Sequence, residues 1–108
     1  MFYLKIKKLL NFNEKSKLFT IPNIYILAQY NGEVRRTTCI WNYYDPEINQ
    51  AFIWDKNKNV NKVILKICSD DPTYKFETIY EETFEMPFGK VQNYKSSVFD
   101  IDAGVTFF

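Results

Sequence analysis

The chain has 108 residues, enough for one domain of ordinary size, so we expect residues 1–108 to form a single domain. Hydrophobic residues make up 46% of the chain and aromatic residues 19%, which supplies a ring-rich core and argues against disorder. Fourteen Lys and Arg residues against thirteen Asp and Glu residues leave a net charge of +1. This basic excess is too small for sequence-independent binding to phosphates, so nucleic acid is not an expected partner.

The sequence favours an intracellular location, either cytoplasmic or peripheral on a membrane. No run approaches the roughly 18 apolar residues that a spanning helix needs, and lysines at positions 5, 7 and 8 interrupt the N-terminal apolar segment. Two cysteines are far fewer than a disulfide scaffold uses, which indicates reduced thiols. The excess of residues with A/T-rich codons indicates an AT-rich genome, of a protist or a large DNA virus. A viral source would add the virion as a location.

Alternation of apolar and polar side chains predicts the first strands of the chain. Residues 2–7 and 24–29 both alternate with the period of a strand that buries one face. Asn31-Gly32 follows the second run directly, and both residue types accept the positive φ angles of a type I′ turn. The sequence therefore predicts a β-hairpin over Asn23–Ile40.

The rest of the chain also has strand character. Apolar residues at 63, 65 and 67 predict the inward face of a strand that ends at Asp70-Asp71-Pro72. Further predicted elements are a strand at Ala51–Trp54, a polar turn at Asp55–Asn61, a strand at Ile79–Met86 and a final pair of extended segments within Ser97–Phe108, around Ala103-Gly104. No 11-residue window has a helical period. Short strands at this spacing predict an all-β, antiparallel sandwich or barrel.

Three blocks of sequence resemble the C2 domain family. Ile21–Ile26 is similar to the family's Asp-Pro-Tyr-Val-x-Val strand start. Arg35–Phe52 is similar to its basic strand followed by an Asn-Pro-x-Trp-Asn-Glu-x-Phe turn, and Leu65–Tyr80 to a strand, an Asp-x-Asp loop and an Ile-Gly step. The resemblance implies an eight-stranded β-sandwich whose three tip loops, here about 11–22, 41–49 and 69–77, bind calcium and lipid.

The resemblance also implies that the calcium site is degenerate. Ca²⁺ takes six to eight oxygen ligands, most of them from carboxylates. Ile21 stands at one of the family's acidic positions in the first loop, and Ser69, Asp71 and Glu77 stand at its acidic positions in the third. One carboxylate is thus lost from the third loop and another lengthened. We expect calcium-independent function, with no metal and no cofactor.

Aromatic residues in the loops are the candidate anchors for a partner. Phe19, Tyr74 and Phe76 fall outside alternating strands, so they either tuck under the sandwich or form an exposed patch. Arg35 and Arg36 point to opposite faces of one strand, with Arg36 outward and Arg35 inward or at the sheet edge. Arg36 then serves either an anionic membrane surface or protein partner, or only the solubility of an edge strand.

Catalysis is not expected. Asp70, Asp71 and Glu77 are an acidic group that general acid/base chemistry uses, but two carboxylates before a proline are ordinary turn formers. Cys39 and Cys68 are predicted to face opposite ways, which disfavours a disulfide, and the chain has no histidine to activate either thiol. Packing or surface roles suit both. The alternative to a docking module is a structural subunit of a larger assembly, such as a viral particle or a cytoskeletal array, as a homo- or hetero-oligomer.

Overall fold

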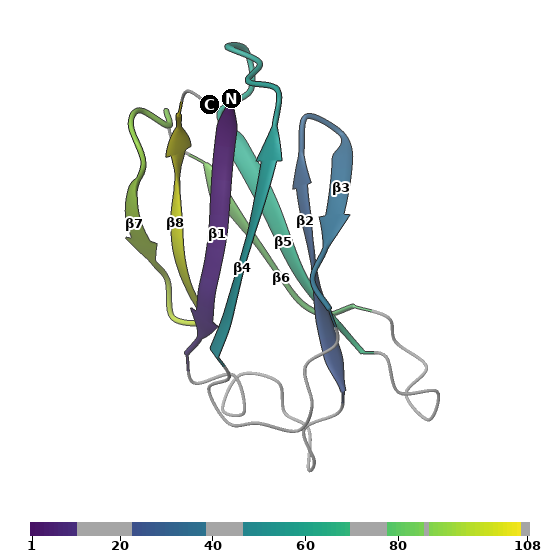
Figure 1. Cartoon of the computed structure of the whole chain (residues 1–108). Coiled ribbons are helices and arrows are strands. Elements are labelled where there is room, and N and C mark those ends of the chain that lie inside the picture. The colour runs from purple at the N-terminus through teal and green to yellow at the C-terminus, as the bar shows by residue number, and fades with distance from the viewer. Residues whose placement is uncertain (11–22, 39–46, 70–77, 86, 107–108) are drawn as a thin grey trace.

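The chain folds into two packed antiparallel β-sheets (Figure 1). The computed structural model describes residues 1–10, 23–38, 47–69, 78–85 and 87–106. One sheet, sheet A, has the strand order β4-β1-β8-β7, and the other, sheet B, has the order β3-β2-β5-β6. The strands of the described residues are β1 (Phe2–Leu9), β2 (Ile24–Tyr30), β3 (Glu33–Arg36), β4 (Glu47–Trp54), β5 (Lys62–Ser69), β6 (Thr78–Glu85), β7 (Gln92–Lys95) and β8 (Phe99–Val105). The predicted eight-stranded sandwich is confirmed.

The core lies between the sheets and is built from every second residue of the central strands. In β1, β2 and β5 buried side chains alternate with more exposed ones, as a strand with one buried face requires. The fully buried members of these strands are Phe2, Leu4, Ile6, Leu9, Ile24, Ile26, Ala28, Tyr30, Val63, Leu65 and Ile67. The inward faces predicted for the first strand, the hairpin strand and the strand at 63–67 are confirmed.

The hairpin between β2 and β3 has the predicted turn. Asn31 and Gly32 have φ angles of 52° and 77°, the left-handed values that a type I′ turn needs at both central positions. Tyr30 pairs with Glu33 directly across this turn. The turn fixes the register of β3, and therefore which of its residues faces outward.

The prediction for the C-terminal segment is wrong. No break occurs at Ala103-Gly104, because β8 continues through both residues, and β7 precedes it. A Cβ atom at position 104 would lie 2.5 Å from backbone atoms of Val91. Glycine is therefore needed here to admit a neighbouring backbone, a reason for glycine inside a strand that the local sequence does not reveal.

Rings and backbone tethers hold together the end of the sandwich that carries both termini (Figure 1). The ring of Phe2 stacks on Tyr30 at 4.3 Å between centroids and lies 5.9 Å from Trp54. The Tyr30 hydroxyl donates to the carbonyl of Asn57 and accepts from its backbone N–H, at 3.2 and 3.1 Å. The Trp54 indole N–H donates to the carbonyl of Glu33, which ties one sheet to the other.

Candidate functional site

The strands that flank the three expected tip loops in the sequence have their adjoining ends at the end of the sandwich opposite the termini (Figure 1). Residues 11–22, 39–46 and 70–77 lie outside the described residues, and β4 begins at Glu47, within the loop expected at 41–49. The strand ends concerned are Leu9 and Ile24, Arg36 and Glu47, and Ser69 and Thr78. We call this part of the molecule the loop end, and the opposite part the terminal end.

Most of the predicted anchors and ligand positions lie outside the described residues. This holds for Phe19, Tyr74 and Phe76, and for the acidic positions Asp71 and Glu77. Cys39 also lies outside them. The structure therefore leaves these assignments as predictions. Arg36 and Ser69 are the predicted site residues that it does describe.

Ser69 is the last residue of β5 and lies at the loop end. It pairs with Ile24 of β2 and is buried, with 9% of its surface exposed. It follows Val63, Leu65 and Ile67 on the inward face of the strand. At this position the chain supplies a neutral hydroxyl, whereas the resemblance places a carboxylate there.

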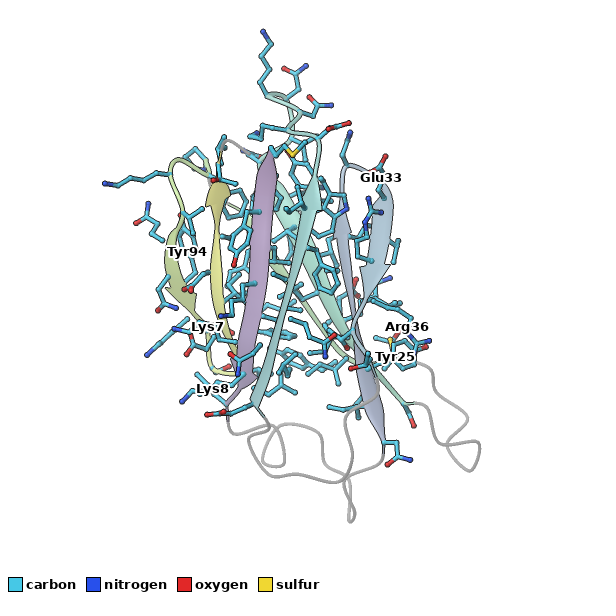
Figure 2. The ribbon with its side chains drawn as sticks, viewed as in Figure 1. Lys7, Lys8, Tyr25, Glu33, Arg36 and Tyr94 are labelled. Carbon is cyan, nitrogen blue, oxygen red and sulfur yellow. The ribbon has the colours of Figure 1, made fainter. Side chains whose placement is uncertain are left out.

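Arg36 ends β3 and presents its side chain on the outer face of sheet B (Figure 2). It pairs with Leu27, whose side chain faces away from the core. Its guanidinium carbon lies 3.9 Å from the centroid of the Tyr25 ring, and its Nε donates to the carbonyl of Thr37 at 3.3 Å. A cation over an aromatic ring at the protein surface gains about 0.5–1 kcal/mol, so the stack with the half-buried Tyr25 favours one orientation of the guanidinium.

Thr37 fixes the backbone directly after Arg36. This threonine is buried, and its hydroxyl accepts a hydrogen bond of 2.9 Å from the backbone N–H of Ile26. Its own N–H donates to the carbonyl of Ile26 at 3.0 Å. The side chain thus replaces a backbone group in the ladder, and Arg36 projects from a fixed part of the chain.

Arg35 faces the other way, as the alternation predicted. It pairs with the buried Ala28, and its guanidinium carbon lies 5.6 Å from the Trp54 ring centroid, across the open side of the sandwich. Its Nη2 lies 3.6 Å from a carboxylate oxygen of Glu33. Of the two arginines, only Arg36 therefore lies on the outer face.

A β-bulge in β1 adds two lysines to the loop end that the sequence analysis did not assign to the site. The register of β1 with both neighbouring strands shifts between Ile6 and Lys8. Ile6 and Leu9 are both fully buried, while Lys7 and Lys8 between them are half-buried, so both lysines face outward. The signal in the sequence is the Ile-Lys-Lys-Leu order, in which two polar residues separate two inward ones.

Charges near these lysines do not form a carboxylate cluster. Lys8 pairs with Glu47 on one side and with Asp100 on the other. Asp100 is buried and accepts a hydrogen bond of 2.7 Å from the Asn93 side-chain amide. Among the described residues no group of three or more His, Cys, Asp or Glu side chains is placed to hold a metal ion.

Basic groups therefore lie on both outer faces near the loop end. Lys7 and Lys8 come from sheet A, and Arg36 comes from sheet B (Figure 2). This arrangement suits contact with an extended anionic surface, because charges spread over two faces do not converge on one small ligand. Cys68, by contrast, is buried and pairs with Tyr25 in the ladder.

The likeness to known proteins is one of fold. No protein-family model and no curated protein matches the sequence. The structure matches human GIVD cytosolic phospholipase A2 in complex with methyl gamma-linolenyl fluorophosphonate, with a TM-score of 0.77 and 17% identity over 95% of this chain. It also matches that enzyme with the same inhibitor and terbium chloride, with a TM-score of 0.68 and 16% identity, and the enzyme alone, at 0.65 and 15%.

This chain corresponds to only a small part of those proteins. It covers 16%, 17% and 15% of the three phospholipase chains. Together with the strand order, the match establishes a C2-like sandwich fold, as the three sequence blocks indicated. In the part of the chain that the structure describes, no helix is long and apolar enough to cross a membrane.

Proposed function

We propose that this chain is a non-catalytic docking module whose loop end contacts an anionic membrane surface without requiring calcium. The observation that carries the proposal is the placement of Lys7, Lys8 and Arg36 on both outer faces near the loop end. Two of these groups project because of the β1 bulge, and the third is held over the Tyr25 ring. All three groups thus lie near the loop end, where a negatively charged surface facing that end would attract them.

The electrostatic attraction expected from three basic groups is strong enough only for reversible docking. A basic residue near an anionic lipid surface contributes about 1 kcal/mol, and the attraction decays within a Debye length. Three such groups contribute roughly 3 kcal/mol by the same rule, which is too weak for stable attachment without an apolar contribution. Binding is therefore expected to weaken steeply as salt rises.

The apolar contribution is assigned, from the sequence, to Phe19, Tyr74 and Phe76. Aromatic rings that enter a membrane interface gain about 25 cal/mol per Å² of apolar surface removed from water. The name of the matched enzyme, a phospholipase, agrees with a fold that works next to phospholipid, although that enzyme is only 15–17% identical to this chain. It supports the choice of a lipid surface over a protein partner.

Independence from calcium rests on the residues at the expected ligand positions. Ile21 contributes no oxygen from its side chain, and Ser69 contributes a buried neutral hydroxyl instead of a carboxylate. A ligand at a hundredfold excess over its Kd would add about 2.7 kcal/mol to the stability of the folded state. We therefore expect the protein to have the same melting temperature in millimolar Ca²⁺ as in millimolar Mg²⁺.

Vesicle co-sedimentation tests the proposal. Wild-type protein should sediment at low salt with vesicles of phosphatidylcholine mixed with phosphatidylserine, and not with phosphatidylcholine alone. The Y74S/F76S variant should lose this binding and still melt cooperatively. A wild-type protein that ignores anionic vesicles at low salt would contradict membrane docking. A variant that unfolds would show that both rings belong to the core, and the tip-loop anchors would be wrong.

A further inference from the structure

The two open sides of the sandwich complement each other. In the described structure β3 and β4 form one side, and β6 and β7 form the other. Neighbouring strands are antiparallel throughout both sheets, so β6 runs opposite to β3 and β7 runs opposite to β4. A second copy placed alongside in the same orientation would therefore continue both sheets with antiparallel pairs. Edge strands offer unpaired backbone groups for this purpose.

One row of residues across sheet A alternates in charge from edge to edge. Lys8 pairs with Glu47 on β4 and with Asp100 on β8, and Asp100 pairs with Lys95 on β7. The row therefore begins with the exposed Glu47 and ends with the exposed Lys95. Lys95 of a neighbouring copy, placed beside Glu47, would continue the alternation without a shift along the strand.

Sheet B has the same property in two adjacent rows. One row runs from Arg36 through Leu27 and Lys66 to Glu81. The next runs from Arg35 through Ala28 and Leu65 to Glu82. Each row thus has a positive residue at the β3 edge and a negative residue at the β6 edge.

The two charged side chains at the ends of each row also point to the same face of sheet B. Because Arg36 and Glu81 share a row, both lie on the outer face, and Arg35 and Glu82 both lie on the inner face. Arg35 and Glu81 keep 42% and 51% of their side-chain surface exposed beside the internal partners Glu33 and Lys66. Each of these two side chains can therefore also contact a residue of opposite charge on a neighbouring molecule.

We propose that copies of this chain associate side by side, with β3 and β4 of one copy against β6 and β7 of the next. The contact joins two different surfaces, so it repeats from copy to copy. A strand twist of about 20–25° between neighbours makes the resulting array a twisted filament. This proposal uses the sides of the sandwich and does not depend on membrane docking at the loop end.

Pairing of like edges is disfavoured by charge. Two β6 strands brought together would oppose Glu81, Glu82 and Glu85 with the same residues of the other copy. Like charges directly opposite each other destabilise a strand pair. The acidic β6 edge is therefore expected to pair with the basic β3 edge of another copy in preference to another β6 edge.

A charge-swap experiment tests the association. Sedimentation velocity of wild-type protein at low salt should show masses that rise with concentration beyond two copies of the 13.0 kDa chain, and that fall as salt is added. The R35E variant and the E82K variant should each need about tenfold more protein to associate, the equivalent of roughly 1.4 kcal/mol. An equimolar mixture of the two variants should restore association, because each altered edge then meets its opposite.

The swap between Glu47 and Lys95 repeats the test at exposed positions of sheet A. E47K and K95E should each weaken association and should restore it when mixed, and both should melt like wild type. A wild-type protein that stays monomeric at low salt, or stops at a dimer, would overturn the proposal. So would folded single variants that associate as wild type does, or mixtures that restore nothing. Vesicle binding is measured separately and tests only the docking proposal.

Discussion

The two ends of the sandwich use aromatic and charged residues in different ways. At the terminal end, Phe2, Tyr30 and Trp54 lie with their rings against one another inside the core. At the loop end, the Tyr25 ring lies on the outer face and carries Arg36. Aromatic rings that are enclosed in the core stabilise the fold. An aromatic ring on the outer face instead holds a charged side chain in place at the surface. Substitutions at the two ends should therefore separate stability from docking.

The largest effect on stability is expected at Trp54. Its side chain is 2% exposed, contacts the rings of Phe2 and Tyr30, and donates to the carbonyl of Glu33. Replacing it with alanine should lower the free energy of unfolding by about 3–5 kcal/mol, as truncation of a large buried ring does. Urea denaturation measures this loss. A loss below about 1 kcal/mol would show that the terminal end is not the main source of stability.

A smaller loss is expected when a methyl group is added at Gly104. Its Cβ atom would lie 2.5 Å from the Val91 backbone, so either β8 or the segment just before β7 must then move. Gly104→Ala should cost about 1–3 kcal/mol, the usual range for overpacking. Gly89→Ala is a matched control, because a Cβ atom there meets nothing within 4 Å. Equal effects of the two substitutions in thermal melts would contradict the close approach.

At the loop end, removal of the Tyr25 ring should change stability only slightly. Tyr25→Leu keeps an apolar side chain and removes the cation–π contact with Arg36, which contributes about 0.5–1 kcal/mol at an exposed site. Vesicle affinity should fall by a few-fold at most, because Arg36 keeps its charge. If Tyr25→Leu abolishes binding altogether, the ring itself contacts the membrane or partner.

The smallest effect concerns Tyr80, on the β6 edge toward the loop end. Burial raises the pKa of its hydroxyl above 10.0, and a hydrogen bond of 2.9 Å to Glu82 together with the charge of that carboxylate raises the pKa further. The folded state thus holds this proton more tightly than the unfolded state. Its stabilising contribution is complete below pH 10.0 and is lost as pH rises through the folded-state pKa.

Glu82→Gln should make this alkaline loss less steep, because it removes the charge that disfavours the phenolate. The measurement is the free energy of unfolding as a function of alkaline pH, with Tyr80→Phe as the reference without a titrating group. A Glu82→Gln profile as steep as that of wild type would show that the carboxylate does not act on Tyr80.

The sequence predicted much of the fold, because alternation and turn chemistry are local. Asn31-Gly32 fixed the hairpin, and the alternation around it gave the outward facing of Arg36 and the inward facing of Arg35. It did not predict β7, which is short and polar, or the continuous strand through Gly104, whose reason is a contact with a distant backbone.

The candidate site was predicted only in part. Lys7 and Lys8 were missed because strict alternation places one of two consecutive residues inside, and only a bulge turns both outward. The charge pairing across sheet edges was also beyond local reasoning, since it depends on the register of all strands in a sheet. The aromatic residues at 19, 74 and 76 lie outside the described part of the chain and stay predictions.

The most direct test compares equal changes of charge at the two ends. The K7Q/K8Q/R36Q variant removes three positive charges from the loop end. The control variant K58Q/K62Q/K90Q removes three positive charges from the terminal end. At about 1 kcal/mol for each charge, the first variant should lose roughly a hundredfold in affinity for anionic vesicles. The second should bind like wild type and keep its stability, and the first should lose no more stability than the roughly 0.5–1 kcal/mol of the Arg36 cation–π contact. Equal losses of affinity in the two variants would contradict a docking surface at the loop end.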